Sequence, residues 1–270
     1  MRGRNEKIIE RYFPGYRGPK RVYEDVLNEQ IDNDTVWLDI GCGRRLCGDE
    51  TLNAELPRRA RLVVGCDRDP HLSRHSSIEN LVLCDAAALP FRHGAFNLVT
   101  ASMVLEHLEK PDVVFAEVAR ISQPRSAFVV FTPNRFNYAM VIASVTPFWF
   151  HVLWKKLSHY FARGEWRDFD DDLFPTWYRA NTRGRLRRLM GKAAFDEAQL
   201  QYLSLAHSFG FIRPLYALSL LFERLIDRFR LDRLKADILG VFVRRGDAEH
   251  TRRVVSDEPR RVAAGGARTS

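Results

Sequence analysis

The sequence of 270 residues has few cysteines, four in all, and no cluster of His, Cys and Asp at the spacing of metal ligands. Cys42 and Cys66 lie in or beside apolar runs, and Cys47 has no CxxC partner. A chain of this length with so little cysteine does not depend on a disulfide framework. We therefore expect reduced thiols, no metal site and a cytoplasmic location. The charged segment 1–11 lacks the apolar core of a secretory signal, which agrees with that location.

Long apolar runs are also scarce. Residues 136–154 carry no Asp, Glu, Lys or Arg over a length that could cross a bilayer. The run contains Pro147 and many aromatic side chains, and Arg135 and Lys155 flank it. These features favour a helix at the cytoplasmic face of a membrane, or inside the protein, over a transmembrane span. A pocket roof and a dimer interface stay equally open, as they do for the shorter apolar helix at 215–222, which has arginines on its flanks.

Acidic residues are fewer than basic ones: 34 Asp and Glu against 42 Lys and Arg, a net charge of +8 and a pI near 9.5. The excess favours anionic partners such as membrane surfaces, nucleic acid or phosphorylated substrates. Part of it lies in residues 246–270, which we expect to be a disordered basic tail. The whole sequence, 46% apolar and 28% charged, is typical of a globular protein with one large domain or two small ones.

Short apolar runs alternate with helix-like segments through the first half of the sequence. The runs are 36–43, 61–67, 80–85, 96–102 and 126–133. This alternation predicts a parallel, doubly wound α/β sheet. Later segments predict a strand at 199–206, an amphipathic helix at 211–229 and a closing strand at 237–245. We therefore predict a mostly parallel seven-stranded sheet with a helical insertion after the fifth strand.

This reading divides the chain into five parts. They are an N-terminal helical lid (1–32), a core (33–135), an aromatic-rich helical insertion or cap (136–198), the C-terminal part of the sheet with a helix (199–245) and the tail (246–270).

Acids and glycines stand where the first three strand-like runs end. Asp39 is followed by Gly41 and Gly43, the second run ends in Asp67, and the third in Asp85. In an open parallel sheet these ends meet at one edge, where ligands bind. Glycines there allow close approach of a ligand to the backbone. Asp67 could accept hydrogen bonds from a ribose diol and Asp85 from an exocyclic amine. Each feature alone also fits a tight turn or a helix cap, but three acids at successive strand ends coincide more rarely.

Four blocks together, VWLDIGCG, VVGCD, LCDAAALPF and FNLVTASMVLEHLEKP, resemble the class I S-adenosylmethionine-dependent methyltransferases. The resemblance covers residues 33–135 and is nearest to the small-molecule group that includes ubiquinone- and sugar-methylating enzymes. It implies a Rossmann-like methyltransferase fold with S-adenosyl-L-methionine as cofactor. The cofactor-binding residues that it implies are Asp39, Gly41, Cys42, Gly43, Asp67, Arg68, Asp85, Ala86, Ser102 and Met103.

The sequence departs from this family at two places. Arg44 and Arg45 stand where a small residue is usual, so we expect a longer or differently shaped loop in which an arginine meets the cofactor's carboxylate. Asn97 replaces the common acid at the start of the fourth strand and is expected to support that strand. A dinucleotide oxidoreductase fits less well, because the sequence lacks both GxGxxG spacing and a Tyr-x-x-x-Lys motif.

The acceptor side of the site is predicted less directly. His107, in the LEH of the fourth block, matches a recurrent position near the substrate and could act as general base, although it could equally cap or pack under a helix. Tyr178, Arg179 and Asn181 lie in a segment that looks like one from methyltransferases of bacterial glycan assembly. They could face the acceptor or form a helix cap. Tyr16 could close over the cofactor, as N-terminal segments of this group often do, and so could Tyr12.

The acceptor itself is predicted from the segment TPNR (132–135), which resembles a turn of the lipid-quinone O-methyltransferases, whose following insertion contacts membrane. We therefore predict O-methylation of a small or lipid-linked acceptor, such as a sugar, glycan or quinone-like ring, by a protein that touches a membrane surface through 136–154 and could form a homodimer. Nucleic acid is a weaker candidate, because the Asn/Asp-Pro-Pro-aromatic and Pro-Cys motifs are missing. An RNA or protein methyltransferase and a cofactor-binding regulator without catalysis are the alternatives.

Overall fold

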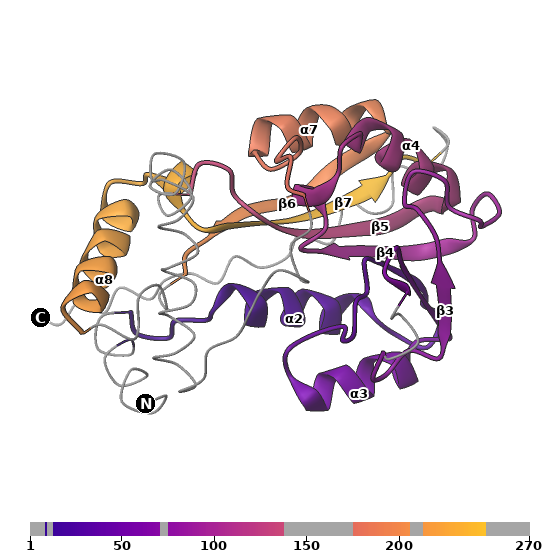
Figure 1. The fold of residues 1–270 in the computed structure, drawn as a ribbon, viewed down its shortest axis with the longest axis horizontal. Coiled ribbons are helices and arrows are strands. Elements are labelled where there is room, and N and C mark those ends of the chain that lie inside the picture. Colours follow the sequence, from indigo (N-terminus) through magenta and orange to yellow (C-terminus); the bar gives the residue numbers. More distant parts are fainter. Residues whose placement is uncertain (1–8, 10–12, 71–74, 138–174, 206–212, 247–270) are drawn as a thin grey trace, which may run out of the picture.

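The computed structural model describes residues 9, 13–70, 75–137, 175–205 and 213–246, and Figure 1 gives its arrangement. The predictions made for Tyr12, for most of the run 136–154 and for the tail after Gly246 lie outside the described residues.

A seven-stranded sheet in the order β3-β2-β1-β4-β5-β7-β6 runs through the molecule. The strands are β1 Val36–Ile40, β2 Leu62–Asp67, β3 Asn80–Leu83, β4 Phe96–Ser102, β5 Ser122–Pro133, β6 Phe195–Leu203 and β7 Asp237–Arg244. The first five are parallel, and β7 is antiparallel to both of its neighbours, β5 and β6. The predicted fold class, a mostly parallel seven-stranded sheet, is confirmed.

Helices cover both faces of this sheet (Figure 1). They are α2 Pro19–Gln30 and α3 Glu50–Arg59 on one face, α4 Pro111–Ile121 and α7 Arg183–Lys192 on the other, and α8 Arg213–Arg228 beyond one end, with the 3₁₀ turns η2 Leu105–His107 and η4 Asp232–Leu234. No described helix is long and apolar enough to cross a membrane.

The core is divided by the sheet into two apolar clusters, and β5 shows why. Phe128 and Val130 point into the cluster with α4 and α7, while Val129 and Phe131 point into the cluster with α2 and α3. Successive side chains of a strand face opposite ways, so a strand covered on both faces must be apolar without interruption. This is the signal that made β1, β2, β4 and β5 visible in the sequence.

Two strands begin earlier than predicted. β5 starts at Ser122 rather than at residue 126, and β6 spans Phe195–Leu203 rather than 199–206. In β6, residues 196–199 are all exposed, because this strand lies at the edge of the sheet and has only one neighbour. An exposed edge strand carries no apolar pattern, so its start could not be read from periodicity.

Candidate functional site

The carboxyl end of β1 turns sharply through two glycines with positive φ. Gly41 (φ 66°) donates its N–H to the carbonyl of Cys66 at 2.7 Å, and a Cβ on it would come within 2.3 Å of the Val104 side chain. Gly43 (φ 55°) donates to the Asp67 carboxylate at 2.9 Å, and no atom lies within 4 Å of where its Cβ would stand. Glycine is thus required at the first position by packing, and at the second it leaves open space beside the backbone.

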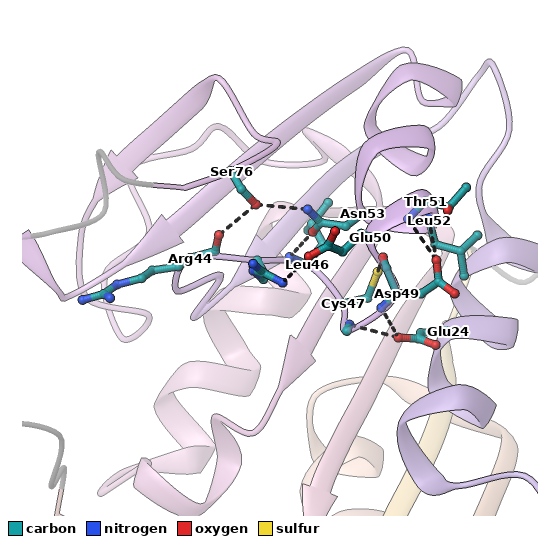
Figure 2. Close-up of polar contacts among 12 residues, drawn as sticks. Glu24, Arg44, Leu46, Cys47, Asp49, Glu50, Thr51, Leu52, Asn53 and Ser76 are labelled. Atoms are coloured by element: carbon teal, nitrogen blue, oxygen red, sulfur yellow. Dashed lines mark hydrogen bonds and ion pairs between the residues drawn. The ribbon is translucent and has the colours of Figure 1, made fainter. Parts of the chain in front are cut away.

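Beyond Gly43 the chain does not enter a helix at once, and helix α3 begins only at Glu50. The intervening loop is held by side chains from three places (Figure 2). The carbonyl of Arg44 accepts bonds from the backbone and side chain of Ser76, and Leu46 N–H donates to Asn53 Oδ1 at 2.9 Å. Asp49 caps α3 by accepting from the backbone of its first turn. The loop between Gly43 and helix α3 therefore has its own set of contacts, and its expected difference from the family stays a prediction.

Helix α2 fixes the other side of this loop. The buried Glu24 carboxylate accepts from Gly48 N–H at 2.9 Å and Asp49 N–H at 3.0 Å (Figure 2). Tyr23, beside it in α2, is buried against Phe131, with ring centroids 5.4 Å apart. Burial, helped by the nearby charge of Asp39, raises the pKa of Tyr23 well above its usual range. Neither Tyr23 nor Glu24 was predicted as a site residue.

A cavity of about 260 Å³ lies between this loop, α2 and the ends of β4 and β5. Ser102 and Met103, both predicted, line it, and Met103 (φ 56°) donates its N–H to the Phe131 carbonyl at 2.7 Å. Charged groups of both signs, Lys20, Glu24 and Arg45, complete the lining.

The acids at the ends of β2 and β3 lie beside the glycine turn. Asp67 accepts from the N–H groups of Gly43 and Asp69, and its carboxylate has further lone pairs for a ligand. Asp85 is exposed, accepts from Ala87 N–H at 2.9 Å, and stands 3.8 Å from Arg68 Nε. The predicted residues therefore meet at one edge of the sheet, with Ala86 packed under them against the core.

Asp39 is placed differently from the other acids. It is only 4% exposed, and it accepts a short hydrogen bond from the Thr100 hydroxyl, which in turn accepts from Trp37 Nε1. Burial raises the pKa of Asp39 to about 7, and the charge of Asp67 adds to this while the Thr100 bond opposes it. Cys42 is likewise buried, with its thiol against Gly65. Both residues support the turn from below, while their predicted contacts with cofactor stay predictions.

His107 lies in η2 with its ring 34% exposed. Its Nδ1 is 2.9 Å from the carbonyl of Pro175, an acceptor, so Nδ1 carries the proton and Nε2 is left with its lone pair in the neutral ring. Nε2 is 4.0 Å from Glu106 Oε1. An imidazole in this arrangement can take up a proton at Nε2 next to a carboxylate.

Two buried acids near His107 were missed by the sequence reasoning. Glu106 accepts from the Thr132 hydroxyl at 3.1 Å, and Asp237 opens β7 opposite Pro133 of β5. Burial raises the pKa of Glu106, and it raises that of Asp237 to about 7, with the Glu106 charge acting in the same direction and Lys20 against it. Because β7 is antiparallel, its first residue lies at the edge where the parallel strands end. Recognising that direction would have revealed Asp237.

The segment 175–181 runs alongside η2, and its three predicted residues have different surroundings. The backbone N–H of Tyr178 donates to the carbonyl of Glu106, and burial together with the Glu106 charge raises the pKa of its phenol. Arg179 points away, donating to the Glu109 carbonyl and covering the Trp177 ring at 4.9 Å. Asn181 is fully buried and donates to Thr132 Oγ1 at 2.6 Å.

Of the three, Tyr178 is thus the best placed to meet an acceptor. Helix α7 is capped by Thr182, whose side chain accepts from Arg185 N–H. A helix cap was one of the two roles predicted for this segment, and contact with the acceptor was the other. The Tyr16 hydroxyl donates to the Ser204 carbonyl, and its ring packs with the buried cluster of Ile9, Tyr216 and Leu220. Its closure over the cofactor stays a prediction.

Comparison with known protein families gives a match for the central part of the chain. The family profile described as "Methyltransferase domain" matches residues 38–130, which run from β1 through the glycine turn and the three acids into β5. Residues 38–130 form a methyltransferase domain. This confirms the predicted class I S-adenosylmethionine-dependent methyltransferase core and its cofactor, and leaves the small-molecule subgroup open.

Relatives extend the likeness around this methyltransferase domain. A Mycolicibacterium smegmatis protein named as a probable S-adenosylmethionine-dependent methyltransferase is 28% identical over 141 residues, which are 48% of this chain and 52% of that protein. The chain thus spans about half the length of this curated relative.

Solved structures agree in fold. An S-adenosylmethionine-dependent methyltransferase from Mesorhizobium loti aligns with a TM-score of 0.52 and 16% identity over 84% of this chain and 98% of that one. A chain from the complex of the Haloferax volcanii Trm112 methyltransferase activator with a methyltransferase has a TM-score of 0.52 and 15% identity, over 92% of this chain and 95% of that one.

The residues at the strand ends and around the cavity fit S-adenosylmethionine. Open space adjoins the Gly43 backbone, and the half-buried Asp67 and exposed Asp85 carboxylates suit the hydroxyl and amine donors of adenosine. A methionine end carries both a carboxylate and an ammonium group, and the adjoining cavity offers Arg45 and Lys20 for the one and Glu24 for the other. Across the described residues, no group of three or more His, Cys, Asp or Glu is arranged to hold a metal ion.

Proposed function

We propose that the protein transfers a methyl group from S-adenosylmethionine to oxygen of a small or lipid-linked acceptor such as a sugar, glycan or quinone-like ring. The observation that supports this proposal is that three features lie at one edge of the sheet. They are the acids Asp67 and Asp85, the cavity with charges of both signs, and the pair formed by His107 and Glu106. Positioning of two reactants in such a place supplies much of the rate of an in-line displacement.

Asp67 and Asp85 would hold the adenosine, and Arg45, Lys20 and Glu24 the methionine end. When bound, S-adenosylmethionine supplies an electrophilic methyl group on a sulfonium. Ser102 and Met103, at the end of β4, form the surface between that end and the acceptor side. Glu24 also ties α2 to the loop by accepting from two of its backbone N–H groups, and α2 would serve as the predicted lid over the cofactor.

His107 would take the proton from an acceptor hydroxyl at Nε2. The Pro175 carbonyl holds the ring by Nδ1, and Glu106 stabilises the charge that the ring gains. The Glu106 carboxylate is in turn held by Thr132, which Asn181 holds. In this assignment Glu106, Thr132 and Asn181 are positioning residues, and Tyr178 contacts the acceptor.

The first test is calorimetric titration of the full chain with S-adenosylmethionine and S-adenosylhomocysteine. Asp67→Ala should weaken both affinities by about tenfold or more, because charge-assisted hydrogen bonds to a ribose are lost. Glu79→Ala removes an exposed acid just before β3 and should bind like the parent. Absence of binding to the folded parent protein would overturn the proposal.

Turnover separates the enzyme from a cofactor-binding regulator. Formation of S-adenosylhomocysteine with any sugar, glycan or quinone-like acceptor supports methyl transfer to that acceptor, and an O-methyl group in the product supports transfer to oxygen. Binding of cofactor with no turnover across an acceptor panel that includes RNA and protein would favour the regulator, and turnover with RNA or protein alone would replace the acceptor class.

A further inference from the structure

Helix α8 has an apolar face with large exposed side chains. These side chains recur every three or four residues, as on one side of a helix. They are Leu218, Leu221, Leu225 and Phe229 just past its end, with exposed fractions of 60, 54, 41 and 64%. We call these four residues the apolar stripe. The opposite side of α8 is buried through Tyr216, Leu220 and Ile226. The helix thus already has a packed face, and the stripe is additional to it.

The surroundings of the stripe are cationic. Arg224, Arg228, Arg230 and Arg233 are all exposed on α8 and the turn after it. The two exposed acids nearby, Asp227 and Asp232, both pair with Lys235, at 2.9 and 2.8 Å, and the third acid, Glu223, is buried in α8. A strip of exposed leucine and phenylalanine bordered by an excess of arginine is the composition of a helix that lies in the plane of a membrane surface.

A groove continues the stripe towards the N-terminal segment. It has a volume of about 600 Å³ and is lined by Phe13, Pro14, Tyr16, Leu221, Leu225 and the charged groups Arg224, Asp227 and Arg228. An apolar floor with arginines at the rim matches a lipid, whose acyl chain is apolar and whose phosphate is anionic.

Helix α8 lies at the same edge of the sheet as the site. It extends beyond the end of the sheet where β5 finishes and β7 begins (Figure 1). Asn134, directly after β5, donates from its side chain to the carbonyls of Arg233 and Lys235, at 2.7 and 2.8 Å. The segment that follows α8 is therefore held at the end of the sheet that carries His107 and the cavity.

We propose that the apolar stripe of α8 docks on an anionic bilayer, with the stripe in the interfacial region and the arginines at lipid phosphates. A second copy of the chain fits the stripe less well, because face-to-face contact would bring the arginines of both copies together while the neighbouring acids are held by Lys235. The docking does not rest on methyl transfer, but it would deliver a lipid-linked acceptor to the proposed site.

The test is cosedimentation of the full chain with vesicles of phosphatidylcholine alone and with roughly one third phosphatidylglycerol, at low and high salt. The anionic vesicles should bind more protein, and salt should weaken the binding. The pair Leu218→Gln with Phe229→Gln should reduce binding about tenfold or more, because both side chains lose their apolar burial in the lipid.

The matched control is Leu83→Gln, which changes a leucine of the same 60% exposure on β3 and should leave binding unchanged. The triple variant, Arg228→Gln with Arg230→Gln and Arg233→Gln, should bind anionic vesicles more weakly, by about fivefold for each arginine that reaches the membrane surface. Its binding to vesicles of phosphatidylcholine alone should not change. Arg188→Gln on α7 serves as their control.

Three results would overturn the docking. They are equal binding by the parent and the stripe variants, absence of binding to anionic vesicles, and a dimer in solution that Leu218→Gln dissociates, which would assign the stripe to a second copy. Titration with S-adenosylhomocysteine on the same variants distinguishes this failure from failure of the proposed function, because the stripe lies outside the cofactor residues and cofactor affinity should not change.

Discussion

At the scale of single residues, Asp39 combines a carboxyl group with almost complete burial. Its pKa in the folded protein is about 7, against an ordinary value of 3.8. At a pH between these two pKa values, the Asp39 carboxyl keeps its proton in the folded state and releases it in the unfolded state. The stability that this proton brings is fully present below about pH 4 and is lost as the pH rises to about 7.

This gives a prediction for the free energy of unfolding. Asp39→Asn, which keeps an oxygen for the Thr100 hydroxyl, should be more stable than the parent near pH 8, by an amount on the order of 4 kcal/mol at most. The difference should shrink near pH 4, where both proteins are neutral at this position. Denaturant unfolding of the ligand-free proteins at the two pH values checks it, with the exposed Asp34→Asn as control. An equal effect at both pH values would contradict the assignment.

His107 gives a second prediction at this scale. With a general base removed, His107→Ala should lower the rate of methyl transfer about a hundredfold. Cofactor affinity should stay the same, because His107 is not a cofactor residue. His93→Ala, in an exposed loop, is the control. Unchanged activity of His107→Ala would make His107 a packing residue.

The acids at the strand ends could be predicted from sequence, and the buried acids could not. Asp67 and Asp85 follow apolar runs directly, so a local pattern indicates both the residue and its edge of the sheet. Glu106, Asp237 and Glu24 come from three distant parts of the chain and are close to the site only after folding. A buried carboxylate has no local signature, because its partners, such as Thr132, stand far away in sequence.

At the scale of elements, α2 and the loop after β1 depend on each other through Glu24. Glu24→Ala removes the acceptor of two backbone N–H groups, those of Gly48 and Asp49, and should lower the free energy of unfolding by about 1.5–3 kcal/mol. It should also weaken S-adenosylhomocysteine binding, since the loop lines the cavity. Denaturant unfolding and calorimetry measure the two effects.

The matched control is Glu29→Ala, an exposed acid in the same helix. If Glu29→Ala lowers stability and affinity as much as Glu24→Ala does, helix charge rather than the loop contact explains the loss.

Elements differ in how well the sequence predicts them. β4 was predicted with its observed bounds, because it is buried on both faces and ends in polar residues. Asn97 supports it as expected, accepting from Val36 N–H at 2.7 Å and donating to the Asp34 carbonyl. The start of β6 was missed, because exposed residues in an edge strand obey no packing constraint. For the apolar residues of α8, the sequence left three roles open: contact with a membrane, a pocket roof and a dimer interface. Amphipathic spacing alone does not tell which apolar side is packed inside the protein.

At the scale of the whole molecule, the sheet has a protected centre and two less protected edges. β5 lies between two partners, and Val129 and Val130 are fully buried, whereas β6 and β3 are edge strands. Amide hydrogens in β5 should therefore exchange only through global unfolding, and those of β6 through local opening at lower free energy. Hydrogen exchange measured at residue resolution tests this. Protection of β6 equal to that of β5 would contradict it.

The strand order also has a consequence for how the protein is made. β7 is the last strand of the sheet to leave the ribosome, yet its place is between β5 and β6. Until it arrives, β6 has no partner strand, and the growing chain displays the open backbone edge of β5, an apolar strand that could pair with another nascent chain. The sheet is therefore closed next to its most buried strand, and only after β6 has been made. The interval before β7 emerges is when the edge of β5 is open to pairing with another chain.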